Sequence, residues 1–443
     1  MKAPGPSALR FLRGSHKHGF LDYVGQLWRE HGDVFQVRIG TRNVLFAMHP
    51  DAIEQITVSG RAKYDKTVSF EPVRRFLTGE GLVGSTGELW KRQRRLMAPF
   101  FTPKAIRSFA DLMILDGLRV EERWQRLAKQ GDEVEIAEEM TQVTASIILK
   151  SMFSSDTIES IDRIRGAVET MISFVTTRST GVPLPVWVPT ARNRRYLAAQ
   201  KLVHRAIAGL IAARRAQPPD QWPDDLLSKM MTLRDPESGE MMAESLVRDE
   251  SITIFFAGHE TTARTMTFAW YALATHPHVT AKLHAELDRV LGGRAPTIDD
   301  VRQLPYTLQV VKEVLRLHPP APFYSRDSVE LDHIGPYEVA PGTIILLSPY
   351  YSHRHPSFWQ NPDKFDPDRW VRPGESNSPA FHPFGSGPRV CIGNSFSLLE
   401  THLLLAILAQ RFTPRLRPSY KATWEMQGVL SLAGGLPMQI VAR

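Results

Sequence analysis

The stretch Phe384-Gly-Ser-Gly-Pro-Arg-Val-Cys-Ile-Gly393 contains the only cysteine of the 443-residue chain, Cys391. Glycines flank this cysteine, and Arg389 precedes it by two positions. An apolar run from Phe396 to Leu408 follows at once and predicts a helix. Backbone N–H groups and the positive end of a helix dipole favour a thiolate over a thiol at such a position. The stretch therefore predicts a soft metal ligand or a nucleophile on a glycine-rich loop.

The same stretch resembles the haem-binding loop of the cytochrome P-450 superfamily, whose pattern is Phe-x-x-Gly-x-Arg-x-Cys-x-Gly. All five fixed positions are filled, by Phe384, Gly387, Arg389, Cys391 and Gly393. In that superfamily the cysteine thiolate holds the haem iron and favours cleavage of the O–O bond. The resemblance covers nearly the full chain and implies that Cys391 ligates iron and Phe384 shields its sulfur, with Gly385 in the same loop. From the residues alone, a buried structural cysteine and a catalytic thiol stay open as alternatives.

A second motif lies at the centre of a helix predicted from about residue 243 to residue 275, where His276-Pro277 ends it. The sequence there is Ala257-Gly-His-Glu-Thr-Thr262, with apolar residues on both sides. A carboxylate and two hydroxyls in a buried helix are costly without a purpose. The stretch is similar to the superfamily's oxygen-activating signature in every fixed position. This implies that Ala257 contacts the cofactor, that Thr261 hydrogen-bonds dioxygen and that Glu260 belongs to the proton-delivery route.

Three finer expectations concern the same helix. Gly258 is expected to let a flat ligand approach and to weaken the helical hydrogen-bond ladder. A hydroxyl that back-bonds to the helix is expected at Thr262 rather than at Thr261. His259 occupies the variable position of the signature and is not expected to be a ligand.

The propionates of a haem need hydrogen-bonded cationic partners where they are buried. Trp90 and Arg94 are four residues apart, hence on one face of a predicted helix. The pair is similar to the superfamily's Trp-x-x-x-Arg, whose side chains reach the propionates, and the resemblance adds Arg389 and Arg326. A solvated basic helix and a surface arginine beside Asp327 are the alternatives.

A structural ion network is predicted from two further motifs. Glu313 and Arg316 have the i,i+3 spacing that lets side chains meet on a helix, and the superfamily has Glu-x-x-Arg here. The stretch Phe365-Asp-Pro-Asp-Arg-Trp370 then supplies Arg369, although Asp368 stands where the superfamily more often has Glu. The resemblance implies a buried Glu313–Arg316–Arg369 network, in which removal of any member is strongly destabilising.

Several apolar residues are candidates for the substrate pocket. They come from the loop-rich stretch 65–88, the long helix, the segment after Pro320 and a hairpin near Val429–Leu432. The candidates are Phe70, Leu82, Val83, Phe256, Ala321, Phe323, Tyr324 and Leu430. Loop hydrophobics that merely pack on the core are the alternative. The proline-broken loop 181–189, with Trp187, is either a lid over the substrate channel or a buried plug.

The periodicity of apolar residues predicts further elements. Helices are expected at 19–31, 49–58, 105–129, 138–152, 156–176 and 225–231, a hairpin at 34–40 and 43–48, and strands at 337–339 and 343–347. No linker, repeat or low-complexity tract divides the chain. We therefore expect one domain over residues 1–443, mainly α with a small β region (α+β) from about 19–60 and 330–350. The resemblance implies the P-450 fold, with haem between the long helix and the cysteine loop.

The composition of the chain indicates the cellular compartment in which the protein works. One cysteine excludes an intramolecular disulfide, which suits a reducing compartment, and a cytoplasmic, soluble protein of bacterial type is expected. No run of 18 apolar residues occurs, and the start has no signal-peptide pattern. The acid-free first 21 residues are alternatively a remnant transit segment.

A formal net charge of +7 suits nucleic acid, an anionic membrane or an acidic protein. No nucleic-acid module is recognised, so an acidic protein partner is favoured. Lys91, Arg92, Arg95, Lys104 and Arg107 are a candidate basic patch for an electron donor, or alternatively a solvated face.

The resemblance thus implies a haem-thiolate monooxygenase with haem b. It is expected to use dioxygen to hydroxylate or epoxidise a hydrophobic small molecule such as a fatty acid, terpenoid or steroid. Electrons are expected from NAD(P)H through a separate reductase and a ferredoxin or flavodoxin, and the protein is expected to be a monomer. The rival hypotheses are a non-catalytic haem sensor or ligand carrier and, without haem, a thiol hydrolase.

Overall fold

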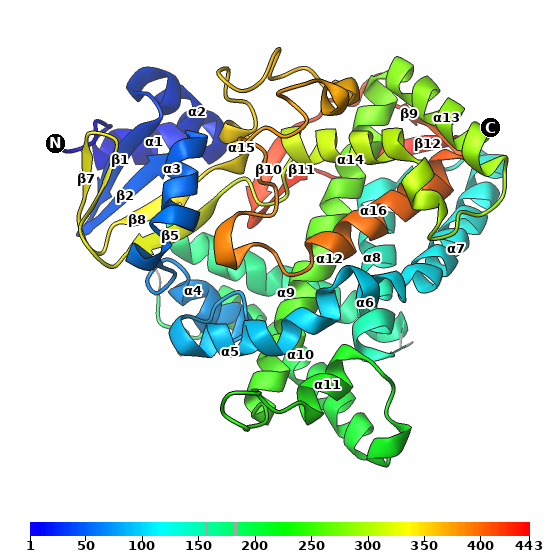
Figure 1. Cartoon of the computed structure of the whole chain (residues 1–443), viewed down its shortest axis with the longest axis horizontal. Helices are drawn as coiled ribbons and strands as arrows, with labels where there is room; N and C mark the ends of the chain where they lie inside the picture. Colours follow the sequence, from blue (N-terminus) through cyan, green and yellow to red (C-terminus); the bar gives the residue numbers. More distant parts are fainter. Residues whose placement is uncertain (156–157, 181–183) are drawn as a thin grey trace. The chain divides into compact units, whose positions relative to one another are not determined.

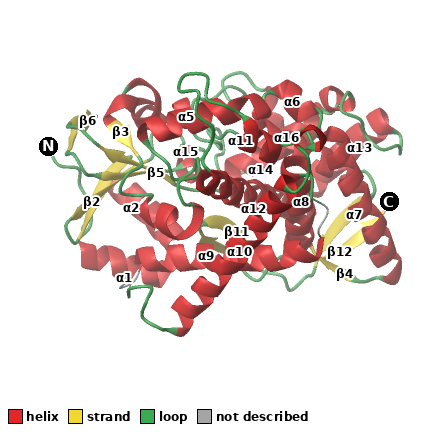
Figure 2. Ribbon diagram, turned by 90° about the horizontal axis from the view of Figure 1, so that it is seen from below, coloured by secondary structure: helices red, strands yellow, loops and turns green. Residues whose placement is uncertain are grey.

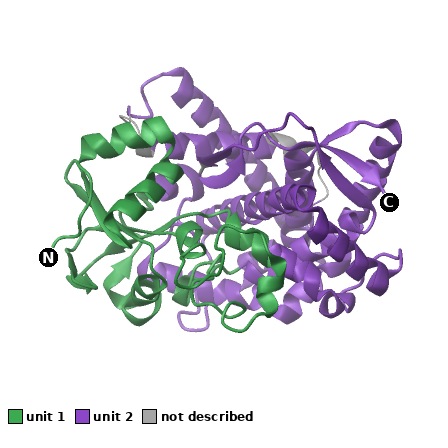
Figure 3. Ribbon diagram, turned by 90° about the horizontal axis from the view of Figure 1, so that it is seen from above, with its two compact units in different colours: residues 1–71, 312–392 green, residues 72–311, 393–443 purple. Residues whose placement is uncertain are grey.

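The computed structural model describes residues 1–155, 158–180 and 184–443. Contacts within the chain define two compact units, each assembled from two separate segments (Figure 3). Unit 1 contains residues 1–71 and 312–392, and unit 2 contains residues 72–311 and 393–443. Neither unit is a contiguous stretch, so the chain enters unit 1, builds most of unit 2, returns to unit 1 and ends in unit 2.

A five-stranded sheet in the order β1-β2-β8-β5-β3 forms the β region of unit 1, beside a two-stranded sheet, β6-β7 (Figure 1). The strands are β1 (Val34–Ile39), β2 (Arg42–Ala47), β3 (Tyr64–Asp65), β5 (Tyr324–Ser328), β6 (Asp332–Ile334), β7 (Tyr337–Val339) and β8 (Ile344–Leu347). Strands β1 and β2 are the predicted hairpin, and β2 pairs in parallel with β8. Alternate residues of the paired strands, among them Leu45, Ala47, Ile345 and Leu347, are buried in one core cluster.

The helices of unit 1 are short. They are α1 (Ala8–His18), α2 (Phe20–His31), α3 (Pro50–Glu54) and α15 (Pro349–Ser352), while α4 (Glu71–Val73) and α14 (Pro305–Leu317) cross the unit boundary. Helix α2 is confirmed, and α3 continues into a π-helical turn at Gln55–Ser59, as the prediction for 49–58 requires. Helix α1 was not predicted because only Phe11 of its residues is buried, which gives little periodic signal.

Unit 2 is mainly helical (Figure 2). Its helices are α5 (Gly87–Met97), α6 (Pro103–Arg107), α7 (Ala110–Gln130), α8 (Ile136–Phe153), α9 (Ile158–Thr180), α10 (Ala191–Arg215), α11 (Leu226–Thr232), α12 (Glu244–Thr275), α13 (Pro277–Leu291) and α16 (Asn394–Ala409). The 32-residue α12 is the predicted long helix, and α13 begins at the proline that ends it. Trp124 of α7 packs edge-on against Trp270 of α12 at a centroid distance of 5.1 Å, so the core of unit 2 includes the long helix.

Two differences from the predicted elements stand out in unit 2. The helix expected over 105–129 is two helices, because the Ser108 hydroxyl donates to the Ala105 carbonyl oxygen (2.7 Å) where α6 ends. A three-stranded sheet, β4-β12-β9, was not predicted, whereas the hairpin β10-β11 was. These strands are β4 (Glu133–Glu135), β9 (Phe412–Leu416), β10 (Trp424–Gln427), β11 (Val429–Leu432) and β12 (Pro437–Ala442).

The expected fold class, mainly α with a small β region, is confirmed. The predicted helix over 156–176 begins in the structure at Ile158, and residues 156–157 and the first three residues of the 181–189 loop lie outside the described chain. Trp187 of that loop is 82% exposed. Among the described helices, none is both long and apolar enough to cross a lipid bilayer.

Candidate functional site

The cysteine loop belongs to unit 1 and packs closely on a neighbouring turn. The Cys391 N–H donates to the Phe384 carbonyl oxygen (2.9 Å), and Cys391 is exposed. Gly387 has a φ of +70°, and a Cβ placed on it would lie 1.8 Å from the Thr57 carbonyl oxygen. The Ser386 and Thr57 hydroxyl oxygens are 2.7 Å apart. Glycine at this position therefore permits both the left-handed backbone and the close approach to the turn.

The loop ends where the unit boundary is crossed. Gly385 also has a positive φ, +72°, and Gly393 is the N-cap of α16. Helix α16 begins at Asn394, three residues after Cys391 in the sequence, two residues earlier than the apolar run indicates. The prediction of a glycine-rich loop that leads directly into a helix is confirmed.

Three cationic side chains of unit 1 influence one another: Lys66, Arg326 and Arg389. Burial, reinforced by the positive charges of Arg326 and Arg389, lowers the pKa of Lys66 well below its usual value. Burial also lowers the pKa of Arg326, and it lowers that of Arg389 to about 10. For each of these groups, nearby negative charge therefore does not offset the cost of burying the positive charge.

The acids beside these cations are Asp65 and Asp327. Asp65 Oδ1 accepts from the Arg389 guanidinium at 3.1 Å. The Asp327 carboxylate instead accepts from the backbone N–H groups of Val68 and Ser69, at 2.6 to 3.2 Å. Three cations thus face two carboxylates, both of which also accept from backbone N–H groups, Asp65 from that of Lys66 at 2.8 Å. Such a cluster suits an anionic ligand that brings carboxylate oxygens.

Lys66 was missed by the sequence analysis, and no local pattern singles it out. It joins the cluster because β3 pairs antiparallel with β5, with Asp65 opposite Asp327. The pairing brings two segments that are about 260 positions apart into register. The Lys66 ammonium also lies 4.0 Å above the ring of Phe70, a predicted pocket residue.

The centre of α12 belongs to unit 2 and carries the predicted acid and alcohol. The Thr261 hydroxyl donates to the Ala257 carbonyl oxygen (2.8 Å), whereas the Thr262 hydroxyl lies 3.1 Å from that of Ser397 on α16. The expectation that Thr262 is the residue that back-bonds to its own helix is therefore wrong, because Ser397 offers Thr262 a partner across the helix interface. Thr261 is half-buried and keeps its oxygen lone pairs available to accept a proton donor.

Glu260 is buried and is held from one side. Its Oε1 accepts from the Arg264 Nε and Nη2 atoms, at 2.9 and 2.6 Å. Its Oε2 has no hydrogen-bond donor in the described part of the chain and lies 3.7 Å from His259 Nε2. His259 Nδ1 donates to the Phe255 carbonyl oxygen (2.6 Å), so the neutral ring has its lone pair at Nε2. Two buried acceptor atoms, Glu260 Oε2 and His259 Nε2, therefore lie near each other without a hydrogen-bond partner in the described part of the chain.

Gly258 lies where α12 meets α8, and the expectation that a flat ligand approaches it stays a prediction. A Cβ placed on it would lie 2.5 Å from the Ile148 Cδ1 atom of α8. The glycine therefore lets α8 approach α12, and it does so on the face that packs against protein. Burial lowers the pKa of His259, which fits the neutral ring described above.

The remaining predicted cofactor and pocket residues are divided between the units. Trp90 and Arg94 both lie on α5 and are half-buried, in unit 2. The pocket candidates Phe70, Ala321, Phe323 and Tyr324 belong to unit 1, and Leu82, Val83, Phe256 and Leu430 belong to unit 2. Leu430 lies inside β11 and is fully buried, so it is not the hairpin tip, which is Gly428.

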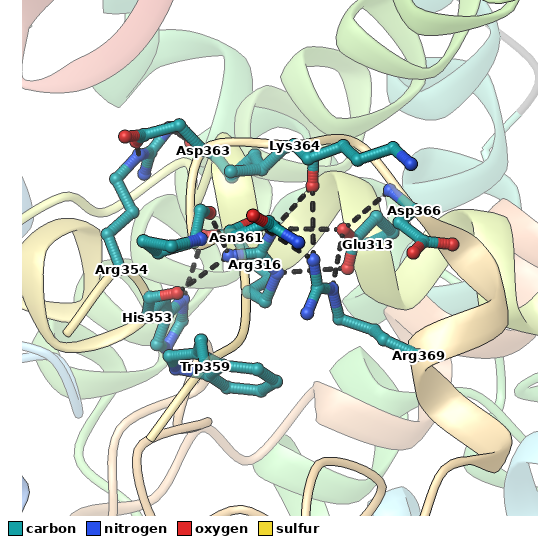
Figure 4. A network of polar contacts seen from close by, with 12 residues as sticks. Glu313, Arg316, His353, Arg354, Trp359, Asn361, Asp363, Lys364, Asp366 and Arg369 are labelled. Atoms are coloured by element: carbon teal, nitrogen blue, oxygen red, sulfur yellow. Dashed lines mark hydrogen bonds and ion pairs between the residues drawn. The ribbon is translucent and has the colours of Figure 1, made fainter. Parts of the chain in front are cut away.

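The predicted ion network is brought together in unit 1 (Figure 4). The Glu313 carboxylate accepts from Arg316 Nε and Nη2 and from Arg369 Nε, each at 2.9 Å, and all three side chains are fully buried. The Trp370 indole and the Asp366 N–H also donate to Glu313. Most of the remaining guanidinium N–H groups donate to carbonyl oxygens, including those of His353, Pro362, Lys364 and Gln360.

A second carboxylate in this network was not predicted. Glu375 Oε1 accepts from Arg369 Nη1 at 2.5 Å, and Glu375 Oε2 lies 3.4 Å from Arg372. Two buried guanidiniums therefore face two carboxylates, and the network is balanced in charge.

Asp33, His49 and His355 form the group of metal-ligand types in the described chain. His49 Nδ1 accepts from the Asp51 N–H (3.2 Å) and His355 Nδ1 from the Ser357 N–H (3.3 Å). His355 Nε2 lies 3.1 Å from Asp33 Oδ1. The Nδ1 atoms of both rings and the His355 Nε2 atom thus already have hydrogen-bond partners within the protein.

Comparison with known proteins assigns the family. A family model described as cytochrome P450 matches residues 2–433. The chain belongs to the cytochrome P450 family. This P450 is 34% identical to cyclooctatin synthase of Streptomyces melanosporofaciens over 93% of its own length and 88% of the relative. It is 33% identical to cyclooctat-9-en-7-ol 5-monooxygenase of the same organism (90% and 88%) and 30% identical to pentalenene oxygenase of Streptomyces avermitilis (88% and 85%).

Membership of the cytochrome P450 family establishes the type of reaction and the cofactor. This P450 is a monooxygenase with a haem cofactor, and it acts on a hydrophobic substrate with dioxygen and electrons from redox partners. The expectations of an oxidoreductase, of the P450 fold and of a bacterial relationship are confirmed.

Proposed function

We propose that this P450 is a haem b monooxygenase that hydroxylates or epoxidises a terpenoid, with NAD(P)H as the source of electrons through a separate reductase and a ferredoxin or flavodoxin. The observation that carries the proposal is the acid–alcohol pair Glu260–Thr261 on α12, in which a buried carboxylate with one unpaired oxygen adjoins a hydroxyl. A haem protein that only bound a ligand would have no need of such a costly pair.

The described residues of unit 1 fit haem by their chemistry. The exposed Cys391 thiol lies on a loop fixed by Gly387 and suits a soft axial ligand. Lys66, Arg326 and Arg389 carry the excess positive charge that propionates would neutralise. In the proposal these residues, with Trp90 and Arg94 of α5, hold the cofactor, and Phe384, Gly385, Gly393 and Ala257 contact it. When bound, haem supplies dioxygen activation and the transfer of one oxygen atom to carbon.

The chain's own contribution to the reaction is the handling of protons. The Thr261 hydroxyl donates to the Ala257 carbonyl oxygen and has lone pairs at Oγ1 that can accept a hydrogen bond. Glu260 is held at Oε1 by Arg264, and its Oε2 atom and the His259 Nε2 atom, 3.7 Å apart, are the two buried acceptors on the proposed proton route. Glu260 is buried and Thr261 is half-buried, so the pair limits access of bulk water and offers single protons a defined route.

Replacement of Thr261 by alanine should uncouple electron consumption from product formation. Without the hydroxyl, protons from Glu260 reach the reaction centre without direction, so product per NAD(P)H should fall about tenfold or more and hydrogen peroxide should rise. The measurement compares product, peroxide and NAD(P)H in one assay. Thr261→Ser keeps the hydroxyl and should retain most of the coupling. Equal coupling in the wild type and Thr261→Ala would remove Thr261 from the mechanism.

Replacement of Lys66 by methionine should weaken haem retention. The apolar stem is kept but the charge is lost, so the affinity for haem should fall about tenfold, as expected for one charge-assisted contact. The rate of haem transfer to an excess of a haem scavenger protein measures this. Arg61→Gln is the control, because Arg61 is exposed and donates to the Val58 carbonyl oxygen. Equal transfer rates in Lys66→Met and the wild type would exclude Lys66 from the cofactor site.

The substrate class is supported by the relatives. The name of one relative gives cyclooctat-9-en-7-ol as its substrate, and the name of another gives pentalenene. Among the three classes that the sequence favours, these names support a terpenoid over a fatty acid or a steroid. Turnover of cyclic terpenes with a surrogate ferredoxin and reductase tests the proposal, and ligand binding without any turnover would favour the sensor or carrier hypothesis.

The basic patch is partly neutralised within the protein. Arg95 binds Asp235 through Nε and Nη2, at 3.0 and 2.9 Å, and Arg92 binds Glu240 at 2.7 Å. Lys91 and Arg107 likewise have acidic partners, Glu88 and Asp299. These pairs weaken the case for a strongly basic docking surface, so the choice between ferredoxin and flavodoxin rests on reconstitution with each. The monomeric state and the cytoplasmic location stay predictions, to be tested by ultracentrifugation and cell fractionation.

A further inference from the structure

Two neighbouring carboxyl groups on α12 bind the backbone of the segment Gly79–Gly84, within unit 2. Asp249 Oδ2 accepts from the Glu80 N–H and Glu250 Oε2 accepts from the Leu82 N–H, each at 3.0 Å. The two N–H groups belong to residues two positions apart in the segment. Two adjacent residues of α12 therefore each bind one backbone N–H of the segment.

Two glycines allow the segment to lie directly on the helix. A Cβ on Gly79 would lie 2.1 Å from Asp249 Oδ2, and the φ of Gly79 is +57°. A Cβ on Gly81 would lie 2.0 Å from Thr253 Oγ1 and 2.7 Å from the Asp249 carbonyl oxygen. Any side chain at either position would push the segment off α12.

The opposite edge of the segment is fixed as well. The Gln93 amide of α5 donates to the Glu80 carbonyl oxygen (2.6 Å), and Arg74 Nη1 donates to that of Gly84 (3.2 Å). The Gly84 N–H closes the turn on the Gly81 carbonyl oxygen (2.9 Å). Leu82, at the centre of the turn, is 8% exposed.

Glu250 is an unusual residue to find inside a helix packed against protein. It is fully buried, and its Oε1 has no hydrogen-bond partner in the described part of the chain. Burial raises the pKa of Glu250 to about 8. Asp249, in contrast, is bound by the Arg248 guanidinium at 2.9 and 3.1 Å. A buried carboxyl without a counter-ion is costly, and its one described contact is the Leu82 N–H.

We propose that Asp249 and Glu250 are positioning residues that fix the 79–84 segment on α12 and thereby set which hydrophobic substrate this P450 selects. The proposal rests on the proposed function and on the sequence-based prediction that Leu82 and Val83 line the substrate pocket. The two carboxyls act through the backbone of the segment and do not touch the substrate. A residue that merely stabilised the fold would lower stability and leave the ranking of ligands unchanged.

The first measurement is amide hydrogen exchange over residues 79–85. Glu250→Ala removes the acceptor for the Leu82 N–H, so protection of this segment should fall by about tenfold or more. Glu250→Gln keeps an acceptor oxygen and should remain close to the wild type. Gly81→Ala displaces the same segment without touching a carboxyl and should also lose protection. Glu244→Ala is the matched control, because Glu244 is on α12 but is exposed and pairs with Arg215.

The second measurement is the affinity of the haem-loaded protein for monoterpene, sesquiterpene and diterpene hydrocarbons, followed as spin-state shifts. In Glu250→Ala and Gly81→Ala, the ratio between the tightest and the weakest of the three should shrink about tenfold, while Glu250→Gln and Glu244→Ala keep it. Unchanged protection in both loosening variants would overturn the positioning role. Loosened exchange with unchanged affinity ratios would overturn the link to selection.

The two proposals fail in different ways. If no terpene shifts the spin state of the wild type, the proposed substrate class fails, and hydrogen exchange still decides whether the carboxyls position the segment. If the wild type binds terpenes but the loosening variants rank them as it does, the substrate class stands and the present inference fails.

Discussion

Alanine at position 313 is expected to destabilise the protein by about 3–5 kcal/mol and to prevent the accumulation of haem-loaded protein. The buried Glu313 carboxylate accepts from Arg316 and Arg369, and from the Trp370 indole and the Asp366 N–H. Its removal leaves two guanidiniums without their shared anion and two further donors without an acceptor. Chemical unfolding and the haem-to-protein absorbance ratio measure the two effects.

Two further variants separate this network from a general effect of acid removal. Glu338→Ala removes an exposed glutamate from β7 of the same unit and should change stability by less than about 0.5 kcal/mol. Arg369→Lys keeps the charge but cannot reproduce the fork of contacts to Glu313 and Glu375, so an intermediate loss is expected. Wild-type haem content and stability in Glu313→Ala would refute the structural role of the network.

Replacement of Cys391 by serine is expected to abolish monooxygenase turnover. A serine hydroxyl stays protonated near neutral pH, so the strongly electron-donating thiolate that favours O–O cleavage is lost. The absorption spectrum of the reduced, carbon-monoxide-bound protein checks this directly. The wild type should show the red-shifted Soret band of a thiolate-ligated haem, and Cys391→Ser should not.

The interpretation of this variant is simple because the chain has a single cysteine. No disulfide can be broken by the change, and no second thiol can replace the ligand. Circular dichroism and the unfolding midpoint of the haem-free protein should match those of the wild type, since Cys391 is exposed. A thiolate-type band that survives in Cys391→Ser would contradict the proposed ligand and with it the reading of the whole loop.

The parts of the site that the sequence predicted are those in which chemistry and spacing lie in one short stretch. The cysteine loop, the Ala257–Thr262 motif and the Glu313–Arg316 pair each occupy one turn or one helix segment, so local geometry follows from the residue order. The long helix was predictable for a related reason, because an uninterrupted apolar pattern ends at His276-Pro277.

What the sequence did not predict depends on pairings between distant segments. Lys66 meets Arg326 only because β3 is in register with β5, and Glu375 meets Arg369 only through an irregular turn. Which neighbour Gly258 contacts depends on which face of α12 packs against α8. The helical pattern alone does not distinguish the faces of a helix that is buried almost all round. The partner of Thr262 likewise depends on α16, which is 135 positions away at Ser397.

The parallel pairing of β2 with β8 also bears on how the chain is made. Val44 pairs with Ile344, 300 positions later, and β5 lies between β8 and β3 in the same sheet. At roughly 5–20 residues per second of synthesis, the open edge of β2 waits about 15–60 s for its neighbour. During that interval the β1–β2 hairpin presents unpaired backbone groups and an apolar face to other nascent chains. The yield of folded protein on expression should therefore rise with added chaperones and with a lower growth temperature. It should depend on these more than on the stability of the finished protein.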